Sequence, residues 1–206
     1  MPDSKGFDCE LDDADAEELQ ELEDCQLHAV RHGLFLGSMA AEASLGSAPA
    51  TGVTHVLQVG GGLRPSFPDK FEYKQVVVDD DEREDLVAHF SACFSFIDQA
   101  LQNEREAGGV LVHCSAGCSR SASVCLGYVM WKEGLCYDEA WRVVHSARPC
   151  ICPNDGFKKQ LREFERIGYD LSKWISWEAV EAQQSRAATE TKLVTDSSKF
   201  CSLGPI

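Results

Sequence analysis

Short hydrophobic runs punctuate the first half of the chain. Residues 33–38 (GLFLGS), 53–59 (VTHVLQV) and 73–78 have the length and the β-branched or aromatic content of strands. Small residues dominate the segment between the first two runs, and we predict a short helix over residues 39–45. A last apolar run at residues 110–112 (VLV) predicts one more strand, directly before a His-Cys pair.

The second half of the chain has the spacing of helices. Phe90, Phe94, Ile97 and Leu101 lie at i, i+4, i+7 and i+11, on one face of a helix. The other predicted helices, each followed closely by glycine or proline, span residues 119–131, 138–147 and 157–167. Strands mixed with helices and then followed by helices predict an α/β fold, with a central mixed, mostly parallel sheet flanked by helices.

The two ends of the chain differ from this middle part. Residues 1–26 hold eleven acidic side chains and one lysine, a charge of −10 within the −15 of the whole chain, which is typical of a disordered arm. The alternatives are that this arm binds a basic partner or screens the active site. We predict one domain over residues 27–168 and a C-terminal tail over residues 169–206. The tail starts as a short helix, with Trp174 and Trp177 packed on the domain rather than on a partner, and then becomes loose.

Composition excludes several classes of protein. The acidic charge disfavours nucleic acid and anionic membranes as partners. No apolar run approaches the length of a membrane span, and no cationic segment precedes one near the N-terminus, so neither a span nor a signal peptide is expected. The ten cysteines include no Cys-x-x-Cys pair. We therefore expect no metal and no cofactor, and free thiols in a reducing compartment, the cytoplasm and also the nucleus.

The stretch HCSAGCSRSA, residues 113–122, joins the last predicted strand to an apolar helix. A loop in this position directs backbone N–H groups and a helix N-terminus at one point, where an anion binds. Ser115, Ala116 and Gly117 are small, as close approach to a ligand requires, and Gly117 tolerates a left-handed conformation. Arg120 adds a planar donor suited to phosphate oxygens. The pattern predicts a phosphate-binding loop.

Cys114 lies inside this loop and is the candidate nucleophile. An ordinary cysteine with a pKa of about 8.5 is only about 3% thiolate at pH 7. One helix N-terminus contributes about 0.3 to 1 kcal/mol, so the loop N–H groups and Arg120 must act together to stabilise a thiolate. The thiolate would attack phosphorus, and water would then cleave the cysteinyl-phosphate without a metal. A buried, inert thiol is the alternative.

This reaction needs an acid that protonates the leaving oxygen. The stretch VVVDDDEREDL supplies Asp79, Asp80 and Asp81 after a predicted strand, and spacing alone does not choose among them. Ser121 is placed to donate a hydrogen bond to the thiolate when it leaves in the second step. His113 is placed to orient the cysteine from behind.

HCSAGCSRSA resembles the signature loop of the cysteine-dependent phosphatases, and the chain around it resembles their dual-specificity branch, closest to the small plant-type members. The likeness spans about residues 30–166 and includes GLFLGS, VTHVL, FIDQAL and RPCICPNDGFKKQL. It implies a protein-tyrosine-phosphatase-like fold, with the phosphate-binding loop between a strand and a helix. It also implies hydrolysis of phosphotyrosine and of phosphoserine or phosphothreonine in proteins.

The resemblance implies roles for individual residues. The catalytic residues would be Cys114 as nucleophile, Arg120 as phosphate ligand, Ser121 as hydroxyl helper, His113 as orienting residue and Asp80 as acid. Counting back from Phe96 to the family's acid selects Asp80, with Asp79 and Asp81 as neighbours that can substitute. The phosphate-binding residues would be Ser115, Ala116, Gly117, Cys118, Ser119 and Arg120. Asn154 would support the loop by hydrogen bonding, a role compatible with capping the next helix.

The loop and the segments on either side of it narrow the range of candidate substrates. Residues 115–119 contain no lysine or arginine, which disfavours phosphoinositides, and the 38 residues from 169 to 206 are too few for a carbohydrate-binding module. A mitogen-activated protein kinase is a candidate substrate, although the segment where the larger kinase-directed members carry a basic docking domain is acidic here.

Other hypotheses stay open. One is a non-catalytic phosphoprotein-binding scaffold on the same fold. Another is the same chemistry on a small phosphorylated metabolite or an RNA end. A further hypothesis concerns oxidation: Cys118, four residues after Cys114, or another nearby thiol would trap oxidised Cys114 as a disulfide. The oligomeric state is left open.

Overall fold

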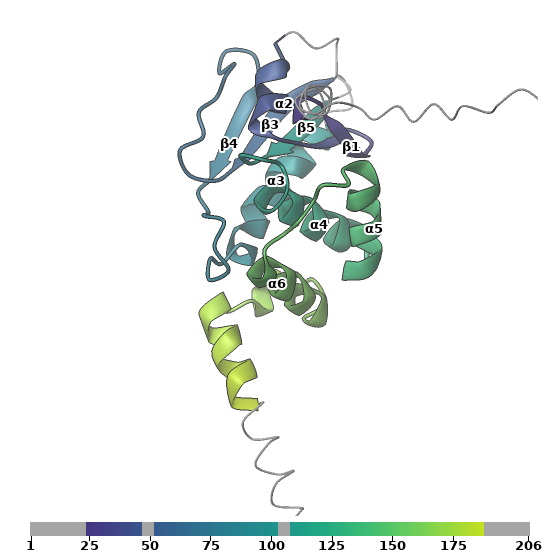
Figure 1. Cartoon of the computed structure of the whole chain (residues 1–206). Coiled ribbons are helices and arrows are strands. Elements are labelled where there is room, and N and C mark those ends of the chain that lie inside the picture. Colours follow the sequence, from purple (N-terminus) through teal and green to yellow (C-terminus); the bar gives the residue numbers. More distant parts are fainter. Residues whose placement is uncertain (1–23, 47–51, 103–107, 188–206) are drawn as a thin grey trace, which may run out of the picture.

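The computed structural model describes residues 24–46, 52–102 and 108–187, and five strands in this part of the chain form one sheet (Figure 1). Their order across the sheet is β1 (His28–Arg31), β2 (Leu34–Gly37), β5 (Gly109–His113), β3 (Val53–Val59) and β4 (Glu72–Val76). β1 pairs antiparallel with β2, and the other neighbours are parallel. The predicted mixed, mostly parallel sheet is therefore confirmed.

Helices cover both faces of the sheet (Figure 1). α2 (Met39–Ser44) packs on one face, against β2 and β5. α3 (Phe90–Leu101) and α4 (Arg120–Glu133) pack on the other face. α5 (Tyr137–Ala147) and α6 (Asp155–Arg166) pack against α4. The predicted arrangement of helices around a sheet is confirmed.

The central strand β5 is buried along its whole length. Val110 and Val112 belong to the core beneath α3 and α4, whereas Leu111 belongs to a smaller core beneath α2. Successive side chains of a strand point to opposite faces, which accounts for this division. A parallel strand that is covered on both faces has a continuous apolar sequence, and this explains the run VLV.

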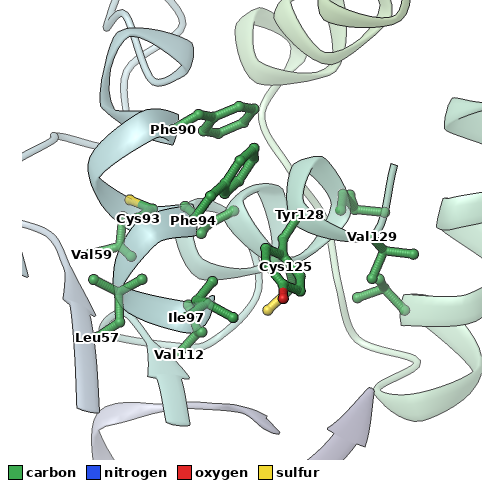
Figure 2. Packing of buried hydrophobic residues seen from close by; sticks show 14 of the residues in the cluster. Leu57, Val59, Phe90, Cys93, Phe94, Ile97, Val112, Cys125, Tyr128 and Val129 are labelled. Carbon is green, nitrogen blue, oxygen red and sulfur yellow. The ribbon is translucent and has the colours of Figure 1, made fainter. Parts of the chain in front are cut away.

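Aromatic and aliphatic side chains fill the larger core. Figure 2 shows residues of four elements in this core: Phe90, Phe94 and Ile97 of α3, Leu57 and Val59 of β3, Val112 of β5, and Cys125 and Val129 of α4. The rings of Phe90 and Phe94 stack with centroids 4.8 Å apart. This packing fixes β5 and α4 relative to each other, so the loop that joins them is anchored at both ends.

The parallel strands bring remote segments to one edge of the sheet. Ligands of open α/β sheets bind at the carboxyl ends of the strands. At this edge β5 ends at His113, next to Cys114, and β3 ends just before Gly60. β4 leads into residues 79–86, which we call the acid loop.

Most predicted elements are confirmed to within a few residues, but the sequence pattern does not predict β1. Only Val30 of its four residues is buried, so the strand has no alternation to recognise. Residues 1–23, which make up most of the predicted arm, and residues 188–206 at the end of the predicted tail lie outside the described residues. No helix in the described part is long and apolar enough to cross a membrane.

The prediction of a helix at the start of the tail is wrong. Leu171–Lys173 form a 3₁₀ turn, Trp174 is extended, and a helix covers residues 177–187 instead. The turn is stabilised by Asp170, whose side chain accepts the N–H of Ser172. The tryptophans pack on the domain, as predicted, because Trp174 contacts the main core and Trp177 is 1% exposed.

Candidate active site

The loop of residues 114–120 has its carbonyl groups turned outward. Four successive carbonyl oxygens accept hydrogen bonds from outside the loop. These bonds run from Met39 N to Ser115 O (3.0 Å), Arg148 Nη2 to Ala116 O (3.0 Å), Arg148 Nε to Gly117 O (3.2 Å) and Cys152 N to Cys118 O (2.8 Å). In a trans peptide the next N–H points away from the carbonyl, so the N–H groups of residues 116–119 point into the loop. This is the anion-binding arrangement that the sequence predicts.

Gly117 is the residue that the loop conformation requires. Its φ is +71°, and a Cβ there would lie 2.4 Å from the carbonyl oxygen of Gly37. A side chain would therefore be strained by the backbone angle and would also collide with β2. The left-handed conformation predicted for Gly117 is confirmed.

The Cys114 thiol lies at the centre of this loop. It is buried, and its Sγ accepts hydrogen bonds from the N–H of Gly117 (3.3 Å) and from the hydroxyl of Ser121 (3.2 Å). Ser121 is the second residue of α4, so the sulfur also lies near a helix N-terminus, which favours negative charge. The structure thus brings Cys114 and Ser121 together as expected from the sequence.

His113 lies behind Cys114. Its Nδ1 is 3.1 Å from the carbonyl oxygen of Cys114, so Nδ1 carries the proton and donates it. Burial lowers the pKa of His113, which keeps the ring neutral. The contact is with the main chain of Cys114 rather than with its thiol, and His113 Nε2 is buried without a hydrogen-bond partner in the described part of the chain.

Arg120 extends from the phosphate loop towards the acid loop. Its Nη2 donates to Ser115 Oγ (3.3 Å) and its Nη1 to the carbonyl oxygen of Val78 (3.4 Å). Its Nε is buried, has no hydrogen-bond partner among the described residues and lies 3.7 Å from Asp80 Oδ2. Gly60 leaves room for this guanidinium, because a Cβ there would lie 2.5 Å from Nη1. Sequence reasoning missed Gly60, which stands out only as the first of three glycines.

Two of the three neighbouring aspartates, Asp80 and Asp81, bond to different partners. Asp80 Oδ1 accepts hydrogen bonds from Ser119 Oγ (2.6 Å) and Asn154 Nδ2 (2.9 Å). Asp81 instead pairs with Arg83, whose hydrogen bonds lower the pKa of Asp81 to about 2. The structure therefore joins Asp80 to the phosphate loop and separates Asp81 from it.

Asn154 performs both functions considered for it. Its Oδ1 caps α6 by accepting the N–H of Phe157 (2.9 Å), and its Nδ2 donates to Asp80. Its own N–H donates to Ser119 Oγ (3.1 Å). The support therefore reaches the phosphate loop through Ser119 and the acid loop through Asp80.

Arg148 is the most important residue that sequence reasoning missed. It is 2% exposed and, besides its two bonds to loop carbonyls, contacts His28 Nε2 (2.8 Å) and Asp24 Oδ1 (3.1 Å). His28 Nδ1 lies 3.0 Å from the carbonyl oxygen of Ala147, so the Nε2 of a neutral ring accepts from Arg148. The available signal was an arginine just before Pro149, at the end of a helix. Buried arginines require partners, but the sequence does not say which.

Cys118 points to a second thiol outside the loop. Its Sγ lies 3.6 Å from Cys150 Sγ. Burial raises the pKa of Cys118 to about 11, so Cys118 is protonated at neutral pH. The disulfide trap with Cys114 stays a prediction. No group of three or more His, Cys, Asp or Glu side chains in the described ranges is placed to hold a metal ion.

A cavity of about 600 Å³ lies elsewhere on the domain, between α3, the end of α4 and the residues after α6. Phe94, Asp98, Trp131 and Tyr169 are among its lining residues. None of the predicted site residues lines it, and we assign it no part in the chemistry.

A thiol that accepts hydrogen bonds at the centre of inward N–H groups, followed by an arginine at the start of a helix, defines the class of cysteine-dependent phosphatases. Comparison with known proteins makes this specific. The family model described as "Dual specificity phosphatase, catalytic domain" matches residues 34–167, and the chain belongs to this family. The resemblance seen in the sequence is confirmed.

Individual relatives agree with this assignment. Dual specificity protein phosphatase 1B of Arabidopsis thaliana is 42% identical over 140 residues, which are 68% of this chain and 82% of that protein. The crystal structure of human DUSP28 has a TM-score of 0.62 and 36% identity, over 68% of this chain and 93% of that one. Human tyrosine phosphatase-like serine/threonine/tyrosine-interacting protein has a TM-score of 0.63 and 33% identity, over 68% and 96%. The chain is therefore a protein phosphatase of the dual-specificity type.

Proposed function

We propose that this phosphatase hydrolyses phosphoproteins through a cysteinyl-phosphate formed on Cys114. The observation that carries the proposal is the pair of hydrogen bonds that Cys114 Sγ accepts from Gly117 N–H (3.3 Å) and Ser121 Oγ (3.2 Å). Donors around a sulfur favour the thiolate, which is the nucleophilic form.

The phosphate group of the substrate binds between the loop and Arg120. The inward N–H groups of residues 116–119 surround its oxygens, and Arg120 contributes the planar fork that fits two oxygens at once. Arg120 Nε is buried and has no hydrogen-bond partner among the described residues, since Asp80 Oδ2 lies 3.7 Å away. A buried donor without a partner is costly, and a phosphate oxygen supplies the missing acceptor.

Asp80 donates the proton to the leaving oxygen. Its Oδ1 accepts two hydrogen bonds, from Ser119 and Asn154, so a proton on the carboxyl group must be on Oδ2. Oδ2 is the oxygen that lies 3.7 Å from Arg120 Nε. The proton is therefore held on the side of the carboxyl group that faces the phosphate.

The second step returns the enzyme to its starting state. Asp80, now a carboxylate, accepts a proton from a water molecule as the water attacks phosphorus. The phosphorus–sulfur bond breaks and the electron pair returns to Cys114. The Ser121 hydroxyl, 3.2 Å from Sγ, stabilises this leaving thiolate.

The substrates are phosphotyrosine and phosphoserine or phosphothreonine residues of proteins, and a mitogen-activated protein kinase is a candidate. A relative from Dictyostelium discoideum is named MAP kinase phosphatase with leucine-rich repeats protein 2 and is 38% identical over 133 residues, which are 18% of its length. Its name supports a kinase substrate, but it is a much longer protein. The test uses a kinase peptide that is phosphorylated on both threonine and tyrosine, and it follows the release of phosphate from each residue. The result tests both the dual specificity and the kinase substrate.

The central experiment is hydrolysis of para-nitrophenyl phosphate in the presence of a chelator. We expect wild-type protein to turn over and Cys114→Ser to lose about 10⁴-fold or more in kcat, as nucleophile removal does in other enzymes. Cys25→Ser, at an exposed thiol, is the matched control and should keep full activity. Acid-quenched protein should carry phosphate on Cys114. Turnover that survives Cys114→Ser would refute the proposal.

A phosphoprotein-binding scaffold is the second candidate. The human phosphatase-like interacting protein has the same fold at 33% identity, so the fold alone does not require catalysis. The presence of Cys114, Arg120 and Asp80 in this chain favours the enzyme. The scaffold would be favoured if wild type and Cys114→Ser were equally inert while both bound a phosphopeptide. Substrate competition with nucleotides and sugar phosphates tests a non-protein substrate.

A further inference from the structure

The acid loop, residues 79–86, receives contacts from a segment that lies beyond the phosphatase domain. The family match ends at residue 167, and the contacting residues belong to positions 174–177. In Figure 1 the helix of residues 177–187, drawn in yellow-green, lies next to α6. Gln184 Nε2 of this helix lies 3.5 Å from Glu163 Oε2 of α6.

Trp177 makes two hydrogen bonds to the acid loop. Its indole Nε1 donates to the carbonyl oxygen of Glu82 (3.1 Å), and its backbone N–H donates to Asp85 Oδ2 (2.9 Å). Trp177 is 1% exposed, so its indole is packed inside the domain. Glu82 is two residues after Asp80, which places this contact close to the acid itself.

Trp174 binds the other oxygen of the Asp85 carboxylate. Its indole Nε1 donates to Asp85 Oδ1 (3.0 Å), which also accepts the N–H of Ala88 (3.1 Å). Asp85 is therefore bonded by both tryptophans while it accepts the N–H of Ala88, a residue of the 3₁₀ turn Val87–His89. Trp174, Trp177 and Asp85 form one connected unit at the C-terminal end of the acid loop.

α6 holds the acid loop from the other side. Gln160 Oε1 accepts the N–H of Leu86 (2.9 Å), and Gln160 Nε2 donates to the carbonyl oxygen of Glu84 (2.7 Å). Gly156 lies so close to Glu82 that a Cβ would be 2.0 Å from the Glu82 carbonyl oxygen. The backbone of Glu82 is thus held between α6 and the indole of Trp177.

We propose that Trp174 and Trp177 are positioning residues for the general acid: they fix the acid loop so that Asp80 Oδ2 faces the phosphate. The inference rests on the role proposed for Asp80. It assigns to the segment after the family domain a part in catalysis, because a hydrogen bond that immobilises Glu82 also restricts the backbone two residues earlier. Loss of these bonds allows the acid loop to move away while the phosphate loop stays intact.

The test compares two substrates in the full chain. A phosphotyrosine peptide has a leaving group that requires protonation, whereas difluoromethylumbelliferyl phosphate has one that leaves without it. Trp177→Phe keeps an aromatic ring and removes the indole N–H. We measure kcat/KM, which reports only the first step, because the second step is the same for both substrates. We expect kcat/KM to fall about 10-fold on the peptide, at the low end of what general acid catalysis contributes, and less than 2-fold on the fluorogenic ester. The fall of kcat/KM at alkaline pH, which reports the essential acid, should become shallower with the peptide only.

Three further variants make the result decisive. Asp80→Asn should show the same preference for the ester, more strongly; if it shows none, the role of Asp80 fails, whatever the tryptophans do. Trp131→Phe, at a tryptophan of α4 that is 37% exposed, is the matched control and should change neither rate. The inference is overturned if Asp80→Asn lowers kcat/KM on the peptide more than on the ester, but Trp177→Phe lowers kcat/KM on the two substrates equally or on neither. Should Trp177→Phe not fold, Asp85→Asn removes the shared acceptor charge and is judged by the same ratio.

Discussion

The phosphate loop and the acid loop meet at Ser119 and Asp80 but are held in different ways. The phosphate loop is one continuous segment between β5 and α4, and its outward carbonyl bonds leave it a single conformation. The acid loop is bonded by side chains that lie 74 to 95 positions away in the sequence. Both loops receive bonds from distant segments, Met39, Arg148 and Cys152 in the case of the phosphate loop. The phosphate loop nevertheless carries its candidate catalytic groups in one short segment, whereas the direction of Asp80 in the acid loop depends on how distant segments pack against it.

Substitution of Gly117 should break the phosphate loop with the largest effect on activity. Gly117→Ala puts a Cβ at 2.4 Å from the carbonyl oxygen of Gly37, at a φ of +71°. We expect kcat/KM to fall about 100- to 1000-fold, the usual cost of misplacing preorganised donors. Binding of tungstate or vanadate, which needs the same N–H groups, should weaken in parallel.

Gly134→Ala is the control for this experiment. Gly134 also has a positive φ, of +67°, but an added Cβ there has nothing within 4 Å. It should lower stability by about 1 kcal/mol and leave kcat/KM within 2-fold. Equal losses in the two variants would mean that backbone strain alone, and not the contact with β2, accounts for the effect.

The residues that define the phosphate loop could be predicted from sequence because the loop is local. Cys114, Gly117 and Arg120 are close together in the chain, and strand, loop and helix follow one another directly. The choice of Asp80 could not be made from spacing, since Asp80 and Asp81 differ only in their tertiary partners. A resemblance to relatives, rather than any pattern in the chain, selected it.

Residues that depend on packing were missed or misjudged. Arg148 binds groups from β1, from the segment before it and from the phosphate loop, and no sequence period relates these. Trp174 and Trp177 were assigned to one helix by their spacing, yet each is oriented by Asp85. The physical reason is that a buried polar partner, rather than an apolar face, determines the local conformation there.

Arg148→Met should destabilise the phosphate loop without touching its own sequence. The change removes the donor of the buried Gly117 carbonyl, the donor of the part-buried Ala116 carbonyl and the partner of Asp24, which is partly exposed. We expect the free energy of unfolding to fall by about 2 kcal/mol, mainly because the buried acceptor loses its donor. Urea unfolding measures this loss, and Arg148→Lys should recover only part of it because lysine lacks the planar fork. A change below 1 kcal/mol would contradict this account.

Protonation of His113 should make the free energy of unfolding of the protein depend on pH. Burial lowers the pKa of His113 in the folded state, whereas the unfolded chain has a histidine pKa of about 6.5. The unfolded state therefore binds more protons between the two values. Stability is full above about pH 6.5 and falls as the pH is lowered through this window, by at most about 1.4 kcal/mol per pH unit for one proton.

Urea unfolding of wild type and His113→Gln at pH 7.5, 6.5 and 5.5 measures this dependence. The neutral glutamine cannot take up a proton, so the variant should have a smaller slope than wild type. The hydrogen bond to Cys114 O and the charge of Glu42 oppose the shift but are smaller causes than burial. Identical slopes would show that His113 does not titrate differently in the two states.

The smallest effect is expected within the acid loop itself, at the aspartate next to the proposed acid. Asp81 pairs with Arg83, and the pKa of Asp81 is lowered to about 2. It is therefore ionised at every pH at which the enzyme would be assayed, and it gains and loses no proton during turnover. Asp81→Asn should change kcat less than 2-fold on a phosphotyrosine peptide and should move neither limb of the pH profile. A loss as large as that of Asp80→Asn would transfer the acid to Asp81 and would mean that Asp80 serves only to join the two loops through Ser119 and Asn154.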